Sequence, residues 1–123
     1  MLEYTLDPQT GVLSIRPEDK LTVADFEKLA TDVDAYLRDN GKLAGLLLTA
    51  DHLPGWESFA ALVQHMRFVR DHQKRIDRVA VVTDNALLKV PPQIFGHFAH
   101  PEVRVFSVSE RGRAEDWLKG ALA

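Results

Sequence analysis

The stretch that decides the fold is GLLLTADHLPGWESFAALVQHMRFVRDHQKRIDRVAVVT, residues 45–83. It begins and ends with short continuous apolar runs, GLLLT at Gly45–Thr49 and RVAVVT at Arg78–Thr83. Apolar runs of this length, bounded by turn or polar residues, are typical of strands buried in a parallel sheet. The residues between them place apolar side chains at helical spacing from Trp56 to His72. A strand, a helix and a strand in this order predict a βαβ unit with a right-handed crossover.

The residues before this unit predict a hairpin followed by a helix. Leu2–Leu6 and Val12–Arg16 alternate apolar and polar side chains, and the Asp-Pro-Gln-Thr-Gly sequence between them has the residues of a tight turn. We therefore expect two antiparallel strands. Thr22 and Asp25 form a variant of the capping box, so a helix should run from Val23 to Asn40, with Gly41 ending it.

The residues after the unit add a third helical segment at 86–99, a strand and a last helix. Val103–Val108 alternates and is typical of an edge strand, and Ser109 is a plausible N-cap for the last helix. The order β-β-α-β-α-β-α-β-α predicts one α/β domain over residues 1–123, with a mostly parallel sheet and one antiparallel N-terminal strand. Leu46–Leu48 and Val79–Val82 should be its most buried strands. The pattern leaves the strand order open.

Three stretches resemble a known family: LPGWESFAALVQHMRFVRDH at 53–72, RVAVVTD at 78–84 and HFAHPEVRVFSVSERGRAEDWL at 97–118. With the element order, they are similar to the SpoIIAA-like family of small bacterial proteins, which shares the STAS-type fold of anti-sigma-factor antagonists and is compared with CRAL-TRIO lipid-binding domains. The resemblance implies a protein without enzymatic activity or cofactor that binds an apolar ligand and a membrane. Antagonists of the STAS group carry a phosphorylatable serine where Trp56 and Glu57 stand here. Ser58 follows a carboxylate that would repel a phosphate, so we do not expect a phospho-switch.

The two helical segments that follow the central strands carry more large apolar side chains than one core stripe needs. Such a surplus next to strand ends predicts a ligand groove between segments 56–72 and 86–99. Its predicted lining consists of Trp56, Phe59, Leu62, Met66, Leu87, Leu88, Ile94 and Phe95. Burial in the core is the alternative for most of these residues. Pro91 and Pro92 should start or kink the third segment, making it a candidate gate.

The faces of segment 56–72 can be assigned by helical spacing. Val63 and Val69 fall on the same arc as Phe59, Leu62 and Met66, which predicts that they face the core. Phe68 lies on another side, at helical spacing from Ala61, His65 and His72. That side is either an exposed surface or a seam against a ligand or a second copy of the chain.

No pattern of catalytic or metal-binding residues accompanies the groove, so neither a catalytic residue nor a metal ligand is predicted. His97 and His100 could share a metal only with further ligands, which the sequence does not supply. Packing or capping is the alternative for the five histidines. Asp51 and Asp84 each follow a central strand, at the edge where such sheets bind ligands, but loop and cap roles explain them equally well.

Charge and composition limit the classes of binding partner and the cellular location that we expect. The net charge of −3 argues against nucleic acid, and the absence of cysteine and of an apolar leader leads us to expect a cytoplasmic protein. A basic run of Arg67, Arg70, Lys74, Arg75 and Arg78 is either a solvated helix end or an attraction to anionic lipid headgroups. The leading hypothesis is a non-enzymatic module that binds an apolar small molecule or lipid and associates reversibly with the membrane surface as a peripheral protein. The alternative is a STAS-type protein interaction module, including a homodimer; a hydrolase ranks last.

Overall fold

The computed structural model describes residues 2–50, 59–84 and 102–120. Five strands form one sheet: β1 (Leu2–Asp7), β2 (Val12–Pro17), β3 (Leu43–Thr49), β4 (Ile76–Val82) and β5 (Glu102–Phe106). They lie side by side in chain order, with β1 antiparallel to β2 and every other pair parallel. The predicted fold class is confirmed, and the structure adds the strand order, with β5 at one edge as expected.

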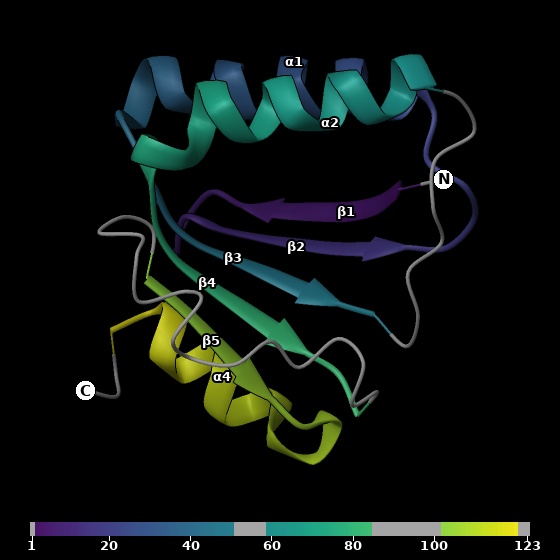
Figure 1. The fold of residues 1–123 in the computed structure, drawn as a ribbon. Helices are drawn as coiled ribbons and strands as arrows, with labels where there is room; N and C mark the ends of the chain where they lie inside the picture. The colour runs from purple at the N-terminus through teal and green to yellow at the C-terminus, as the bar shows by residue number, and fades with distance from the viewer. Residues whose placement is uncertain (1, 51–58, 85–101, 121–123) are drawn as a thin grey trace.

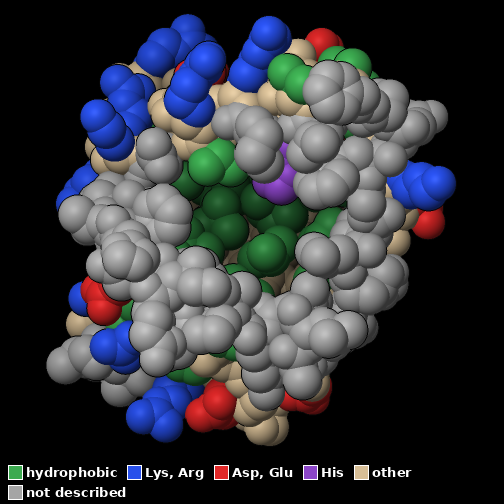
Figure 2. Space-filling view, in the orientation of Figure 1, with side chains coloured by type: hydrophobic (Ala, Val, Ile, Leu, Met, Phe, Trp, Pro, Cys, Tyr) green, Lys and Arg blue, Asp and Glu red, His purple; other side chains and the backbone are tan. Residues whose placement is uncertain are grey.

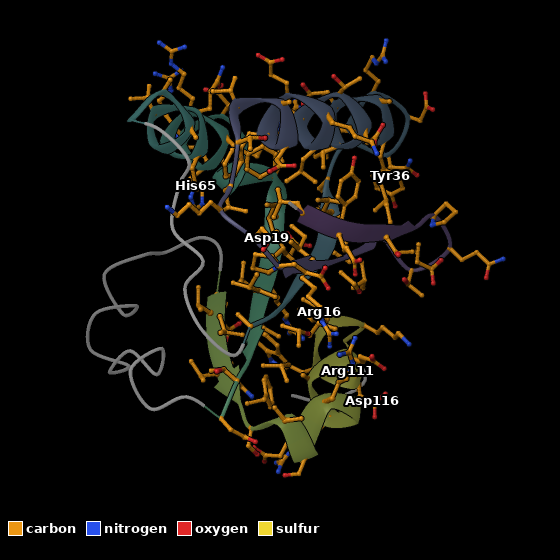
Figure 3. The ribbon with its side chains drawn as sticks, turned by 90° about the vertical axis from the view of Figure 1, so that its right-hand side faces the viewer. Arg16, Asp19, Tyr36, His65, Arg111 and Asp116 are labelled. Carbon is orange, nitrogen blue, oxygen red and sulfur yellow. The ribbon has the colours of Figure 1, made fainter. Side chains whose placement is uncertain are left out.

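Helices cover both faces of this sheet (Figure 1). They are α1 (Val23–Asn40), α2 (Phe59–His72) and α4 (Arg111–Leu118), with single 3-10 turns at η1 (Gln73–Arg75) and η3 (Val108–Glu110). The crossovers through α1 and α2 both advance the sheet in the same direction, and right-handed connections then place both helices on one face. Figure 3 shows α1 and α2 together above that face and α4 on the other side of the sheet.

The ends of α1 follow from local chemistry. The backbone N–H of Asp25 donates to Thr22 Oγ1 at 3.1 Å, and the backbone N–H of Thr22 donates to Asp25 Oδ2 at 2.9 Å. Gly41, at a φ of 79°, donates its N–H to the carbonyl of Leu37 at 2.8 Å and ends the helix. The predicted bounds, capping box and stop are all confirmed.

Two apolar clusters hold the layers together. On the α1 and α2 face, Leu13 and Ile15 of β2 pack with one side of α1 and with Phe68 of α2. On the opposite face, Leu47, Ala80 and Val82 pack against Trp117 and Leu118 of α4. The α4 face of β3 and β4 is therefore buried, as their continuous apolar runs predicted, whereas Leu46, Leu48 and Val79 on the other face are only partly buried.

The start of the last helix differs from the prediction at Ser109. Ser107, not Ser109, is an N-cap, and it caps the 3-10 turn η3 that leads into α4, whose own N-cap is Glu110. The backbone N–H of Ser107 donates to Glu110 Oε1 at 3.1 Å, and its hydroxyl donates to the same oxygen at 2.9 Å. Glu110 lies three residues after Ser107, which is the spacing that lets a carboxylate reach back to the cap.

The predicted faces of α2 are wrong in two places. Phe68 is only 9 % exposed and belongs to the core, whereas Val69 is 43 % exposed. Ala61 and His72, which share the side of Phe68, are buried as well. The cause is that α2 packs sideways against α1 as well as downward on the sheet, so its buried arc is turned toward its neighbour.

Several sequence predictions lie outside the described residues. These are the kink at Pro91 and Pro92, the role of Ser58, the position of Asp51, and His97 and His100. Within the described ranges, no helix combines the length and the apolar character needed to cross a bilayer.

Candidate functional site

The sheet face below α2 carries two rows of aliphatic side chains. The strand registers align Leu13, Leu46, Val79 and Val103 in one row, and Ile15, Leu48, Val81 and Val105 in the next. Because side chains alternate between the faces of a sheet, each row points to one side. That side is the α1 and α2 face, since Leu13, Ile15, Leu46, Leu48 and Val79 all pack with the cluster under α1.

Burial along these rows falls from β2 toward β5. Leu13 and Ile15, under α1, are 0 % and 7 % exposed. The six side chains further along, on β3, β4 and β5, are only half-buried; we call them the apolar floor: Leu46, Leu48, Val79, Val81, Val103 and Val105. Figure 2 shows hydrophobic side chains gathered at the bottom of a hollow in this face.

The chemistry of the apolar floor is uniform. All six side chains are leucine or valine, so the floor has neither a hydrogen-bonding nor an ionisable side-chain group. Its backbone groups on β3 and β4 are engaged in parallel ladders on both sides, whereas β5, at the edge of the described sheet, pairs with β4 alone. Across β3, β4 and β5 it extends over two strand spacings, or about 10 Å. Such a surface can hold an aliphatic chain by contact and offers no side chain for a proton transfer.

His65 belongs to α2, which lies on the same side of the sheet as the apolar floor. Figure 3 shows its ring extending from the underside of the helix. The ring is half-buried and stacks on Phe26 of α1, with 4.9 Å between ring centroids and an interplanar angle of 17°. Burial of the imidazole lowers the pKa of His65 below its ordinary value, because the charged form loses hydration. The ring is therefore neutral around pH 7 and acts as an apolar packing surface.

His72 fastens the end of α2 to α1. Its side chain is buried, its Nδ1–H donates to the Phe68 carbonyl at 2.8 Å, and its Nε2 lies 2.7 Å from Asp34 Oδ1. The ring also stacks on Phe68 at a centroid distance of 4.2 Å. Both described histidines thus pack and bridge helices, which confirms the packing alternative for His65 and His72.

The structure does not place the predicted groove lining. Trp56, Leu87, Leu88, Ile94 and Phe95 lie outside the described residues. The backbone of Phe59, Leu62 and Met66 is part of α2, but their side chains lie outside the described set as well. The predicted groove therefore stays a prediction, and the structure contributes the surface beneath it.

Sequence reasoning missed the apolar floor because it counted those residues as core. The only signal in the sequence for an exposed floor came from the valines of β5. The alternation in 102–106 is typical of an edge strand, and one face of such a strand is less well covered than the other. Leu43 of β3 and Ile76 of β4 are buried in the cluster with α1, and nothing in the sequence of either strand indicates that the residues after them are less covered.

The carboxyl ends of the strands show no acid–base arrangement in the described residues. Asp84 follows β4 and is exposed, and its Oδ1 accepts the backbone N–H of Val108 at 2.9 Å. This contact explains Asp84 as a loop cap. Within the same described ranges, no three side chains of the metal-ligating types come together.

Comparisons with known proteins agree with this architecture. The family model described as SpoIIAA-like matches residues 12–119. A crystal structure of an uncharacterised protein of the DUF3478 family from Shewanella loihica PV-4, described as having a SpoIIAA-like fold, is similar with a TM-score of 0.72 and 22 % sequence identity. That similarity covers 96 % of this chain and 92 % of the other and concerns the fold. No curated protein matches. Since the family model spans most of the chain, this protein belongs to the SpoIIAA-like family.

Proposed function

We propose that this protein is a non-enzymatic binding module that holds an apolar small molecule or a lipid chain on the apolar floor. The observation that carries the proposal is the half-burial of six aligned aliphatic side chains in the middle of a sheet face. Aliphatic residues at the centre of a finished core are covered on all sides. A concave apolar surface that keeps its exposure is the common form of a small-molecule site.

Magnitudes set the affinity that an experiment should expect. Full burial of one aliphatic side chain is worth about 1.5–3 kcal/mol, and the floor residues are already half-covered. Six of them together contribute about 5–9 kcal/mol, and each methylene of the ligand that is buried adds about 0.8 kcal/mol. The lost freedom of the ligand opposes this with about 4–15 kcal/mol. A single chain should bind in the micromolar to millimolar range, so weak-binding methods are needed.

The direct test is a titration of the protein with decanoate and with decanol. Isothermal titration calorimetry measures the affinity, and amide chemical shifts locate the binding site. We expect saturable shifts in β3, β4 and β5 with both probes, because the floor recognises the chain and not the head group. Val81→Thr keeps the shape of the side chain and adds a hydroxyl, and it should weaken binding several-fold. Val69→Thr, the same change on the exposed side of α2, is the matched control and should leave affinity unchanged.

Two results would count against lipid binding. One is the absence of saturable shifts on the floor with either probe. The other is the absence of any co-purified lipid in native mass spectra of protein prepared without detergent. Together they would favour the second candidate, a STAS-type regulator that acts by protein interaction.

A specific surface supports the second candidate. Arg67, Arg70, Lys74 and Arg75 are exposed on α2 and η1, and Val69 is exposed among them. Arg70 has a close ion pair with Asp71 at 3.0 Å, whereas no ion pair involves Arg67, Lys74 or Arg75 in the part of the chain that is described. Such a surface suits an acidic partner. The basic surfaces of two copies of this protein would repel each other, so this surface disfavours a homodimer through α2.

Reversible membrane association would use this same basic surface. Flotation with phosphatidylglycerol vesicles should then recover the protein, whereas phosphatidylcholine vesicles should not. Arg67→Gln with Arg75→Gln should reduce recovery, and raising the salt concentration should abolish it. Equal recovery with both kinds of vesicle would contradict an electrostatic attachment.

A further inference from the structure

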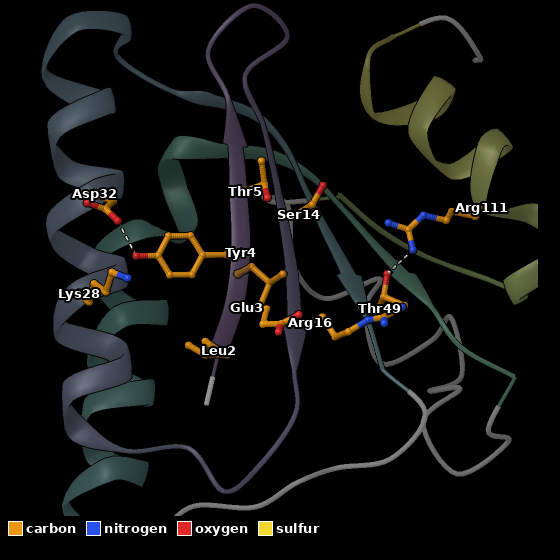
Figure 4. Close-up of a pocket in the computed structure, with 11 residues that line it drawn as sticks. Leu2, Glu3, Tyr4, Thr5, Ser14, Arg16, Lys28, Asp32, Thr49 and Arg111 are labelled. Atoms are coloured by element: carbon orange, nitrogen blue, oxygen red, sulfur yellow. Dashed lines mark hydrogen bonds between the residues drawn. The ribbon is translucent and has the colours of Figure 1, made fainter.

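The open half of the sheet face on the α4 side carries a polar depression. Because α4 packs on β3 and β4, none of the described helices covers the hairpin of β1 and β2 on this face (Figure 1). A depression of about 680 Å³ wraps around this hairpin. On the α4 side its wall is formed by Thr5, Ser14, Arg16, Thr49 and Arg111, together with Glu3 (Figure 4).

The register places these side chains on one face. Glu3 lies opposite Arg16, and Thr5 lies opposite Ser14, in the pairing of β1 with β2. Ser14 shares its side of β2 with Val12, which packs in the cluster under α4. The other lining residues, among them Tyr4 and Asp32, project to the α1 side, where the Tyr4 hydroxyl donates to Asp32 at 2.5 Å.

Two guanidinium groups from different elements converge in this depression. Arg16 comes from the end of β2 and Arg111 from the first turn of α4, and both extend toward Thr49 (Figure 4). Arg111 Nη1 lies 3.4 Å from Thr49 Oγ1, and its Nε lies 3.4 Å from Glu115 Oε1. Arg16 makes no ion pair within the described ranges, even with its cross-strand neighbour Glu3.

This arrangement leaves most of the donors of both arginines unused. A guanidinium has five N–H groups, and its planar fork matches two oxygens of a phosphate or carboxylate. Like charges that point to one place repel each other unless an anion lies between them. The hydroxyl groups of Ser14 and Thr49 add neutral donors beside the two cations.

We propose that this depression binds a phosphate-type oxyanion between Arg16 and Arg111. The site lies on the opposite face of the sheet from the apolar floor and is independent of it. Glu3 faces the same side and opposes the binding of an anion, which predicts weak affinity in the wild type and a gain when its charge is removed. The oxyanion is either that of a soluble phosphate ester or that of a lipid headgroup.

The experiment titrates the protein with inorganic phosphate and with glycerol phosphate, at constant ionic strength, and follows amide and arginine side-chain chemical shifts. We expect saturable shifts confined to Arg16, Thr49 and Arg111, with a millimolar dissociation constant. Arg16→Gln and Arg111→Gln should each weaken binding about tenfold or more, because each removes charge-assisted hydrogen bonds. Glu3→Gln should strengthen it two- to fivefold, as an estimate for one exposed like charge.

Arg113→Gln is the matched control. Arg113 lies on the same helix and is exposed, it pairs with Glu110 at 3.8 Å, and it does not line the depression. Its loss should leave affinity for phosphate unchanged. Equal weakening by Arg113→Gln and Arg111→Gln would show only a diffuse charge effect and would overturn the proposal. All variants concern exposed side chains, and circular dichroism checks that each is folded.

A second arm separates the two sources of the oxyanion. If phosphatidylglycerol vesicles recover the wild type and Arg113→Gln but not Arg16→Gln or Arg111→Gln, while soluble phosphates do not bind, the oxyanion belongs to a lipid. If soluble phosphates bind with the stated variant pattern, it belongs to a small molecule. If neither arm depends on Arg16 and Arg111, the site does not exist. Binding of decanol to the apolar floor should be unaffected by any of these variants.

Discussion

Gly45 is a point of close approach between β3 and α4. A Cβ atom at this position would lie 2.7 Å from Leu118 Cδ2 and 2.9 Å from Leu118 Cβ. Leu118 Cβ is tied to the helix backbone, so a larger residue would push α4 away from β3. The close contact therefore requires glycine at this point of the strand.

Gly45→Ala should lower the free energy of unfolding by about 1–3 kcal/mol, the usual cost of overpacking a core. Urea denaturation measures it. Gly112→Ala is the control, because a Cβ there meets nothing within 4 Å and alanine favours the helix. That variant should be neutral or more stable by up to about 1 kcal/mol. Equal stability of Gly45→Ala and the wild type would show that α4 adjusts freely.

His65 should make stability depend on pH. Burial lowers its pKa in the folded state below the ordinary value of 6.5, so the unfolded chain takes up the proton more readily. The stabilising effect of the neutral ring is complete above pH 6.5 and is lost as the pH falls through the folded-state pKa. His65→Phe keeps the stack on Phe26 and should flatten the decline. An imidazole resonance of His65 that titrates at or above pH 6.5 would contradict this.

At the residue scale, sequence reasoning succeeded where the contact is local. The pairing of Thr22 with Asp25 needs only three residues of chain, so its residue types are sufficient to predict it. The half-burial of Val81 and Val103 depends on how far the helices α1 and α2 extend over the sheet, which is set by tertiary packing. A single sequence without a structure contains no measure of that cover.

At the element scale, α2 shows what determines which face of a helix is buried. Its apolar residues occupy a wide arc, and helical spacing alone placed Val69 inside and Phe68 outside. The structure reverses them because Phe68 and His72 face α1. The direction of a helix face is therefore predictable only when one neighbour dominates, as the sheet does for α1.

Truncation of each side chain distinguishes the two assignments. Phe68→Ala should cost about 3–5 kcal/mol of unfolding free energy, because it leaves a cavity between α2, α1 and the sheet. Val69→Ala should change it by less than about 0.5 kcal/mol, as expected for an exposed position. Urea denaturation of both variants gives the comparison. A larger loss for Val69→Ala than for Phe68→Ala would restore the assignment made from spacing.

At the scale of the whole molecule, the sheet should have graded protection. β3 and β4 each have a strand on both sides and apolar clusters on both faces. Amides of Leu46–Leu48 and Val79–Val82 should therefore exchange with solvent most slowly, near the rate set by global unfolding. The amides of Gln9 and Thr10 in the turn between β1 and β2 are the internal reference and should exchange fast. Similar rates in both places would be inconsistent with β3 and β4 as the centre.

The strands of the sheet lie in chain order, and this order determines when each strand can pair during synthesis. Each new strand pairs with the one just made, so the sheet can grow as the ribosome delivers it. The face formed by Leu47, Ala80 and Val82 stays bare until α4 emerges, because Trp117 and Leu118 supply its cover. Arg78 then holds the end of the helix, with Nη1 donating to the Trp117 carbonyl at 2.5 Å. A nascent chain that stops before residue 111 would present that bare face to chaperones.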